Sequence, residues 1–240
     1  MEITRRFTHL KYRLMPYLAA TAEAAHTDGL PVLRHLLLGF GDDRSALNAD
    51  TQYMLGDSVL VAPVLDADGQ VDVYVPDGVW TSLLDGSTVT GPRWVHPVHS
   101  TGSLPVLVRP GSLLPWGNQT SRPDYDWADG VTLRAFELAD GDRREVVVPA
   151  ADGGDGTRFV VERAGERLVA TGPASLWRLQ SGDIGRTGAA PTRVSSRSRP
   201  RYDRITPPGP PVPAPAREHA PRASASPSRG TAPAVQGPRG

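Results

Sequence analysis

The sequence of 240 residues predicts a mainly β fold, and three observations lead to this prediction. From Gly56 onward, short apolar or alternating runs are separated by turn signals at the rate typical of β-sandwich domains. Before Gly56, a helical pattern is followed by a continuous apolar run, which is the local pattern of an α/β barrel. After Gly182 both patterns end, and this last stretch holds half of the 24 prolines. The expected parts are a barrel remnant at 1–55, a first β-sandwich at 56–117, a smaller β domain at 118–182, and a disordered tail at 183–240.

The barrel remnant is expected to begin with a helix over residues 5–26, because apolar side chains recur there every three or four positions. Pro16 lies inside this pattern and lacks a backbone donor, so we expect a kink near Tyr12. Gly29 follows the last helical residue and is expected to form a left-handed cap.

Two further segments belong to the remnant. Residues 30–38 form a short, continuous apolar run, which predicts a strand buried on both faces. Residues 48–55 are expected to form a short helical turn, with Asn48 or Asp50 as its N-cap. Without the rest of a barrel, part of the apolar run would be an exposed patch, so we expect poor solubility of the isolated chain. The residues of this patch are Leu33, Leu36, Leu37 and Leu38.

The β part is expected to fall into two blocks of short strands. The first block contains Val59–Leu65, Val71–Val75, Trp80–Leu84, Trp94–Val98, Leu104–Arg109 and Ser112–Trp116. Its strands are separated by turn signals that include Asp66–Gly69, Pro76–Gly78 and Gly91–Pro92. The second block contains Val131–Leu138, Arg143–Val148, Thr157–Glu162, Arg167–Thr171 and a shorter Ser175–Leu179.

The formal net charge of zero hides an uneven distribution. Residues 183–240 contain ten arginines against three acidic residues, a net charge of +7, so residues 1–182 carry −7. The net negative charge of residues 1–182 argues against nucleic acid as a partner of this part of the chain. The absence of cysteine excludes disulfides and thiolate metal sites, and it is compatible with a cytoplasmic location. The start of the chain lacks the apolar region of a secretory signal, and no apolar run approaches the ~20 residues that cross a bilayer, so we expect no membrane partner.

Several segments of the sequence match one enzyme family in order and spacing. Gln52–Val64 resembles a signature near the end of the catalytic barrel of glycoside hydrolase family 31, which holds α-glucosidases and α-xylosidases. Phe7–Leu18 is similar to the helix outside the end of that barrel, and Gly29–Arg34 to the strand that follows it. Gly102–Pro115 resembles a late strand pair of the family. The chain therefore resembles the C-terminal part of such an enzyme.

The second β block resembles one branch of the family. Arg122–Trp127 and Val148–Gly153 are more similar to the distal domain of bacterial α-xylosidases than to that of α-glucosidases. The resemblance covers residues 5–180. Because the Pro- and Arg-rich composition after that point is what a shifted reading frame of a GC-rich gene would give, we expect a truncated or frameshifted product.

The resemblance implies a retaining hydrolase of terminal α-linked xylose that uses no metal or cofactor. Such an enzyme needs two carboxyl groups about 5–5.5 Å apart, and the family places its Asp nucleophile and Asp acid on earlier barrel strands. No position of this chain matches those motifs, so we assign no catalytic, substrate-binding or metal residue and expect no activity from the chain alone. An α-linked oligosaccharide would be a partner only of the intact enzyme. The alternatives are a carbohydrate-binding β module and one half of a split glycosidase, with a barrel partner or a homo-oligomer.

Some local groups could suggest a site but have simpler interpretations. Asp42 and Asp43 are adjacent and are typical of a turn. Asp124–Gly130 resembles a calcium loop, but its third acid and its glycine come one position late. His96 and His99 lack the helical spacing and the third ligand of a zinc site, so surface histidines are expected. For the single histidines His26 and His35, packing or a helix end is the default interpretation.

Arginine and tryptophan offer two further candidates. Arg34 on the apolar run is expected to pair with a carboxylate if buried, and Asp57 is the candidate partner. In an intact enzyme Arg34 could also support the active site. A sugar-stacking platform could be formed by exposed rings, but packing in cores is the simpler interpretation of tryptophans in strand patterns. These are Trp80, Trp94, Trp116 and Trp127.

Overall fold

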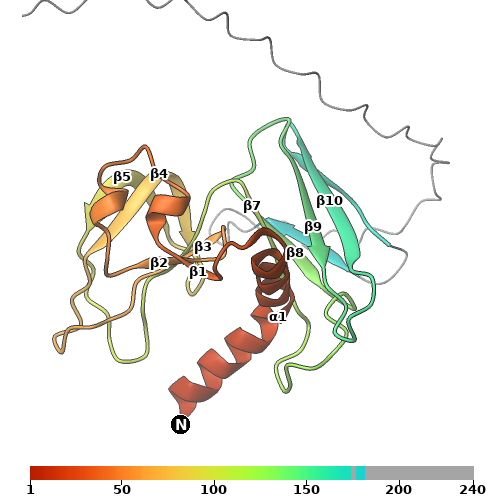
Figure 1. The fold of residues 1–240 in the computed structure, drawn as a ribbon, viewed down its shortest axis with the longest axis horizontal. Helices are drawn as coiled ribbons and strands as arrows, with labels where there is room; N and C mark the ends of the chain where they lie inside the picture. The colour runs from red at the N-terminus through yellow and green to blue at the C-terminus, as the bar shows by residue number, and fades with distance from the viewer. Residues whose placement is uncertain (174–176, 182–240) are drawn as a thin grey trace, which may run out of the picture. The chain divides into compact units, whose positions relative to one another are not determined.

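The structure is a computed structural model, and it describes residues 1–173 and 177–181 (Figure 1). These residues contain one α-helix and twelve β-strands, which confirms the predicted mainly β fold. The chain divides into two units, Met1–Ser198 and Arg199–Gly240, and the predicted tail at 183–240 lies outside the described residues. Within the described part, no helix combines the length and apolar character that a membrane crossing requires.

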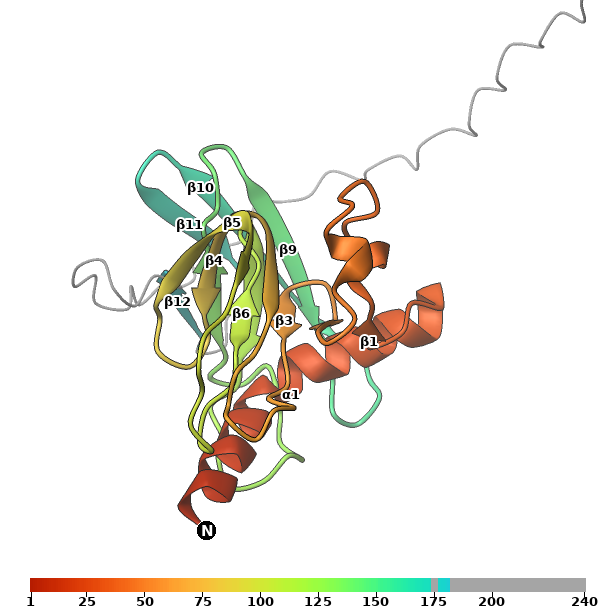
Figure 2. The same ribbon diagram turned by 90° about the vertical axis from the view of Figure 1, so that its left-hand side faces the viewer.

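Six strands form the first sheet, in the order β1-β2-β3-β6-β4-β5, and all neighbours are antiparallel. Figure 2 shows β3 and β6 side by side in this sheet. The strands are β1 (Leu33–Arg34), β2 (Tyr53–Leu55), β3 (Val59–Val61), β4 (Val73–Ser82), β5 (Thr88–Val95) and β6 (Val106–Val108). A turn is present at Asp66–Gly69, with Gly69 at φ 76°, but the predicted hairpin is wrong, because β6 lies between β3 and β4 in the sheet.

The prediction that Pro76–Gly78 ends a strand is wrong, because β4 runs through these residues to Ser82. The register of β4 against β5 shifts between Val75 and Gly78, so the turn signal produces a bulge inside a long strand. Gly91, also predicted to separate strands, lies inside β5 opposite Gly78. The turn signals at Pro76–Gly78 and Gly91 lie opposite each other on paired strands. One bulge accommodates both, and the pairing of β4 with β5 continues beyond it.

The remaining six strands form two three-stranded sheets, in the orders β12-β8-β7 and β11-β10-β9. Their bounds are β7 (Ser112–Trp116), β8 (Thr132–Phe136), β9 (Arg143–Val148), β10 (Thr157–Ala164), β11 (Arg167–Thr171) and β12 (Arg178–Ser181). β12 runs parallel to β8, whereas the other pairs are antiparallel. Because β7 pairs with β8, the predicted domain boundary at 117 falls between two strands of one sheet.

The apolar side chains form three clusters, and β3 shows how they are separated. Leu60 points into the first cluster and Val59 and Val61 into the third, because successive strand residues face opposite sides of a sheet. The first cluster is built on Trp80, whose side chain is fully buried. The second lies between the two small sheets, around Phe159 and Leu133.

The helix α1 (Glu2–Asp28) is longer than predicted and passes through Pro16 without ending. Gly29 caps it with φ 72°, as predicted. Leu14 and Tyr17 of α1 are buried in the third cluster together with β3, β6, β7 and β8. Figure 1 shows α1 beside β7 and β8. The helix is therefore part of the core of the β domains and does not depend on a barrel for all of its packing.

Two carbonyl groups of α1 bind the chain that follows β7. Pro16 has no N–H, so the carbonyl of Tyr12 lacks its usual partner one turn further on. The Tyr125 hydroxyl donates to this carbonyl over 2.8 Å, and the amide of Gly117 donates to the carbonyl of Arg13 over 2.7 Å. Pro16 thus leaves the Tyr12 carbonyl free to accept a hydrogen bond from Tyr125, which links α1 to the chain that follows β7.

We expect Tyr125→Phe to lower the free energy of unfolding by about 1–2 kcal/mol, because a part-buried carbonyl loses its donor. In a Pro16→Ala background the new amide can donate to Tyr12, so the same substitution should cost clearly less. A double-mutant cycle from urea unfolding measures this difference. An equal cost in both backgrounds would contradict the explanation.

The segment between α1 and β2 differs from its prediction. Residues 30–38 do not form a buried strand: β1 has two residues and is followed by the 3₁₀ helix η1 (Leu36–Leu38). Residues 48–55 do not form a helical turn, because η2 (Ala46–Asn48) precedes them and Tyr53–Leu55 pairs as β2. Only Leu36 of the expected apolar patch is buried, in the first cluster. A continuous apolar run does not distinguish a two-sided strand from a segment with one covered face.

Candidate functional site

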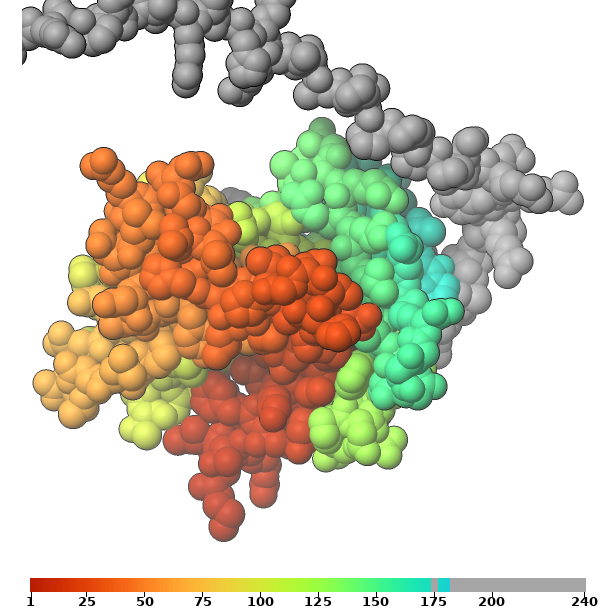
Figure 3. Space-filling view, in the orientation of Figure 1, coloured from red at the N-terminus to blue at the C-terminus, as the bar shows by residue number. Residues whose placement is uncertain are grey.

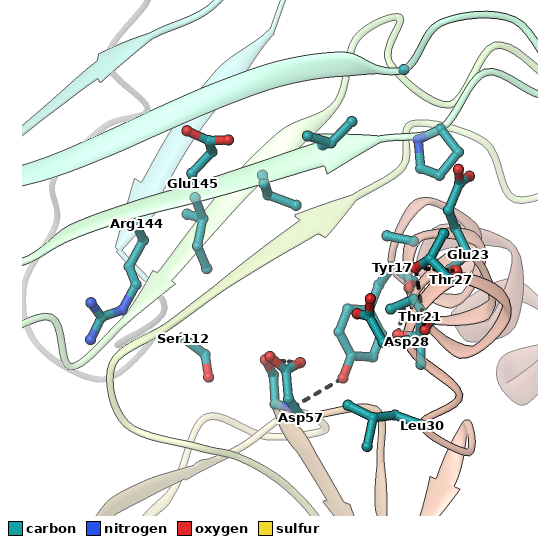
Figure 4. Close-up of a pocket in the computed structure, with 18 of the residues that line it drawn as sticks. Tyr17, Thr21, Glu23, Thr27, Asp28, Leu30, Asp57, Ser112, Arg144 and Glu145 are labelled. Carbon is teal, nitrogen blue, oxygen red and sulfur yellow. Dashed lines mark hydrogen bonds between the residues drawn. The ribbon is translucent and has the colours of Figure 1, made fainter. Parts of the chain in front are cut away.

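A groove of about 810 Å³ lies between α1 and β9, and we refer to it as the α1–β9 groove. Its walls are the C-terminal half of α1 and the strand β9, and its floor is made by the β2–β3 and β6–β7 turns. Figure 4 shows Arg144 and Glu145 on one side and Tyr17, Thr21 and Asp28 on the other. The lining is mixed, with carboxylates, guanidinium groups, hydroxyls and small apolar side chains.

Tyr17 fixes the floor of the groove to the helix. Its hydroxyl donates to the carbonyl of Leu55 over 2.5 Å and accepts from the amide of Ser58 over 3.1 Å. Gly56 between them has φ 65°, and a Cβ there would lie 2.3 Å from the Tyr17 hydroxyl oxygen. Burial, and then the nearby Asp57 carboxylate, raise the pKa of Tyr17 to about 12. The Tyr17 phenol therefore stays protonated near neutral pH and links α1 to the β2–β3 turn through its two hydrogen bonds.

The carboxylates of the groove are held by separate neighbours. Asp57 accepts a hydrogen bond from the Ser58 hydroxyl over 3.0 Å. Glu145 on β9 is paired with Arg158 on the adjacent strand β10. Figure 4 shows Asp57 and Glu145 on opposite sides of the groove. This arrangement does not resemble the facing pair of carboxyl groups that glycoside hydrolysis requires.

The predicted ion pair of Arg34 with Asp57 is wrong. Arg34 is only half-buried, and its Nε donates to the carbonyl of Pro31 over 2.8 Å. No Arg34–Asp57 pair occurs among the ion pairs of the described residues. Since the side chain reaches solvent, it does not need the carboxylate that full burial would demand.

The groups that could suggest a metal have local partners. His96 Nδ1 lies 2.6 Å from Asp72 Oδ1, and His99 Nδ1 lies 2.9 Å from the Ser103 hydroxyl. Asp126 accepts from the amides of Ala128 and Asp129, as in an Asx turn. Within the described part of the chain, no group of three or more His, Asp or Glu side chains could hold a metal ion.

The other single candidates also take part in local structure. Asp43 accepts from the amide of Ser45 and from the Tyr74 hydroxyl, as expected of a turn residue. His35 accepts from the amide of Leu37 and caps η1. His26 is exposed in the last turn of α1.

The four tryptophans named above as candidates for a sugar platform take part in packing. Trp80 is fully buried in the first cluster, Trp127 packs against the second, and Trp116 packs against the third. Trp94 is 39% exposed, with its ring centroid 5.4 Å from that of Tyr74. Three of the rings thus belong to three different clusters, which favours the packing interpretation over a common sugar platform.

Arg134 is a buried cation that the strand pattern did not reveal. In β8 it alternates with Leu133 and Ala135, so it reads as a solvent-facing residue, but it is 5% exposed. Its guanidinium carbon lies 5.0 Å from the centroid of Trp116 and 5.2 Å from that of Phe136. Burial lowers its pKa. The signal in the sequence was Phe136, which shares the face of Arg134 and shows that this face is covered.

The segment that follows α1 carries four exposed leucines, Leu30, Leu33, Leu37 and Leu38, which we name the leucine face. Leu30 also lines the groove. Leu33 and Leu38 are 58% and 56% exposed. Figure 3 shows this part of the chain, in orange-red, at the molecular surface. Three of the four leucines of the expected apolar patch are therefore exposed as predicted, and Leu36 is not.

Comparison with known proteins identifies the chain's family. The model described as "Glycosyl hydrolase family 31 C-terminal domain" matches residues 29–114, and "Alpha-xylosidase YicI, C-terminal domain" matches residues 126–207. The chain carries the C-terminal domains of glycoside hydrolase family 31. The second match extends to residue 207, past the point near 180 where the resemblance was expected to end.

Curated relatives of these family 31 domains are much longer proteins. Alpha-xylosidase XylQ of Lactiplantibacillus pentosus is 38% identical over 173 residues, which are 70% of this chain and 22% of the relative. An alpha-xylosidase of Emericella nidulans is 36% identical over 140 residues, 55% of this chain and 18% of the relative. The chain therefore spans about a fifth of the length of the relatives it matches.

Solved structures support the fold of the family 31 domains. The Flavobacterium johnsoniae GH31 dextranase superimposes with a TM-score of 0.65 at 24% identity, over 74% of this chain and 25% of that chain. The GH31 alpha-xylosidase of Xanthomonas citri gives a TM-score of 0.61 at 21% identity, over 79% of this chain and 24% of that chain. These structures confirm the predicted fold, and the two family models confirm the predicted family.

Proposed function

We propose that this chain is the non-catalytic C-terminal part of a retaining glycosidase that releases terminal α-linked xylose. The observation that carries the proposal is the consecutive match of the two C-terminal domain models, the second of which describes an α-xylosidase. The similarity to XylQ supports the same substrate class. The cytoplasmic location stays a prediction from composition.

In this proposal the β domains act as a scaffold. The carboxylates of the α1–β9 groove are tied to their own neighbours and do not form a hydrolytic pair. The leucine face offers an apolar surface that a catalytic barrel can cover. The helix α1 is anchored in the third cluster by Leu14 and Tyr17, so a barrel that packs on its outer side would be held at a fixed orientation.

A chimaera tests the function. The matching C-terminal region of XylQ is replaced by residues 1–181 of this chain, and hydrolysis of an aryl α-xyloside is measured. We expect turnover within about tenfold of XylQ, whereas XylQ truncated before this region should be inactive. Because the catalytic barrel of the chimaera is that of XylQ, its turnover tests the scaffold role of this chain. A chimaera no better than the truncated enzyme would overturn the scaffold role.

The leucine face leads to a separate prediction for the chain alone. Replacing Leu33, Leu37 and Leu38 by Gln should make the isolated chain more soluble and leave its thermal unfolding nearly unchanged, because these side chains are largely exposed. Static light scattering and a thermal melt measure both effects. As a control, Leu36→Gln places a polar side chain in the first cluster, where Leu36 is fully buried, and should unfold the chain. A wild-type chain that is already a monodisperse monomer would contradict the aggregation argument.

A further inference from the structure

We propose that the α1–β9 groove binds an extended segment of the catalytic chain, which adds as a further strand to the free edge of β9. This inference rests on the proposed function, because it names the partner of the groove. Strand addition to an exposed sheet edge is a common mode of polypeptide recognition, in which backbone hydrogen bonds supply the affinity.

The outer edge of β9 is unpaired within the described sheets, since the order is β11-β10-β9. The amide of Arg163 donates to the carbonyl of Asp142 over 2.9 Å, and this sets the hydrogen-bonding phase of the β9–β10 ladder. Antiparallel partners alternate between bonded and non-bonded pairs. Glu145 and Val147 therefore turn their backbone N–H and C=O groups away from β10, and both residues line the groove.

β9 differs from the other edge strands of the described sheets. Natural edges are blunted by proline or by short length. β5 contains Pro92 and β7 contains Pro115, whereas β1, β11 and β12 have two, five and four residues. β9 has six residues and no proline. It is the longest proline-free edge among them, and Glu145 and Val147 on it line a groove.

The groove has the space and the chemistry for a polypeptide. A strand added to β9 would lie about 4.8 Å from it. Ala20 and Ala24 on the facing side of α1 are small, and Val146, Val147 and Leu30 add apolar surface. The charged lining residues nearly balance, which suits a polar backbone better than an anionic ligand. These residues are Glu23, Asp28, Asp57, Glu145, Arg34, Arg109 and Arg144.

The position of the groove points to the catalytic chain as the occupant. Leu30 lines the groove, and the other leucines of the leucine face follow it within eight residues of the chain. Under the proposed function the leucine face is where the catalytic barrel docks. The chain corresponds to 22% of XylQ and matches C-terminal domain models, so most of such a relative precedes this region. A segment of that preceding part can reach β9 along the same surface.

Hydrogen exchange on the full chain of 240 residues gives the first test. We expect the amides of Glu145 and Val147 to exchange at least tenfold faster than those of Arg144 and Val146, which bond to β10. Slow exchange that disappears when the chain is ended at Ser181 would show that the chain's own C-terminal residues occupy the edge. Slow exchange that depends on protein concentration would show a second copy there. Either result would overturn the proposal.

The chimaera with XylQ gives the second test. There the amides of Glu145 and Val147 should become at least tenfold slower to exchange than in the isolated chain. Val147→Pro removes the outward N–H and should abolish the slowing at Glu145, whereas Val147→Thr keeps the N–H and a similar shape and should preserve it. In the isolated chain the two variants should melt within a few degrees of each other, because this N–H takes no part in the β9–β10 ladder.

The outcomes separate this inference from the proposed function. An active chimaera with fast exchange at Glu145 and Val147 would overturn strand addition and leave the scaffold role intact. An inactive chimaera with slow exchange at these amides would support strand addition and overturn the scaffold role. Equal protection in the Pro and Thr variants would also overturn strand addition, since it would mean that no backbone donor at 147 is used.

Discussion

Gly91→Ala is expected to destabilise the first sheet by roughly 3–5 kcal/mol, the range of the most severe single substitutions. A Cβ at Gly91 would lie 2.0 Å from the carbonyl oxygen of Pro76 and 2.4 Å from that of Val75. These atoms belong to the backbone of β4, so no side-chain rotation can relieve the contact. The two strands would have to separate at the bulge, next to the buried Trp80.

A matched control separates this clash from the general effect of replacing glycine. Gly39 has φ −112°, and the nearest atom to its added Cβ is a guanidinium nitrogen at 3.9 Å. Gly39→Ala should therefore be neutral or stabilise by about 0.4–1 kcal/mol, because it restricts only the unfolded chain. Urea unfolding of both variants, in the soluble glutamine background described above, measures the difference. A Gly91→Ala variant as stable as Gly39→Ala would show that β4 and β5 are not paired as described.

Alkaline pH is expected to unfold the protein through three tyrosines. Burial, first among the causes in each case, raises the pKa values of Tyr17, Tyr74 and Tyr125 to about 12. For Tyr74 a hydrogen bond to Asp43 adds to the effect. A folded pKa above the ordinary value of 10 means that the neutral phenol stabilises the fold. This stabilisation is fully present below pH 10 and is lost as pH rises towards 12, by up to roughly 2–3 kcal/mol for the deeply buried Tyr17 and by less for Tyr74 and Tyr125, whose phenols solvent screens in part.

Tyr74→Phe provides the check on this pH dependence. The variant should be less stable near neutral pH, since Asp43 loses its donor, but its stability should fall less steeply above pH 10. Urea unfolding from pH 8 to 11.5 gives both curves. Parallel curves for wild type and variant would mean that Tyr74 does not contribute to the alkaline transition.

The sequence was sufficient where a strand follows a firm turn signal. β7, β9 and β11 have the predicted bounds, because each begins shortly after a Pro-Gly, Asp-Gly or Ala-Gly turn. The left-handed cap at Gly29 was also predicted correctly, since it depends on local conformation alone.

The errors arose where tertiary contacts decide the local structure. Pro76–Gly78 reads as a turn, but Gly91 on the neighbouring strand lets the backbone approach and keep pairing. Leu36 reads like its neighbours Leu37 and Leu38, yet only Leu36 reaches the first cluster. Arg134 alternates with apolar neighbours like an exposed strand residue, but Trp116 and Phe136 lie beside its guanidinium group. For Pro76–Gly78 and Leu36 no local pattern contains the deciding contacts, whereas Phe136 was a local signal for Arg134.

The candidate site was harder to predict than the fold. That the chain has no catalytic motif stays a prediction from the sequence, because the resemblance places the carboxyl pair on strands that precede this region. The α1–β9 groove could not be predicted from the sequence, since it depends on how α1, β9 and the turn at Ser58 come together. The free edge of β9 likewise follows from the sheet order and not from the composition of the strand.

The initial rate of aryl α-xyloside hydrolysis by the purified chain tests the central claim most directly. If the chain supplies scaffold and no hydrolytic carboxyl pair, the rate should equal that of buffer at every pH, while the XylQ chimaera turns over under the same conditions. Turnover by the chain alone, abolished by Asp57→Asn or by another single carboxylate substitution, would contradict the account.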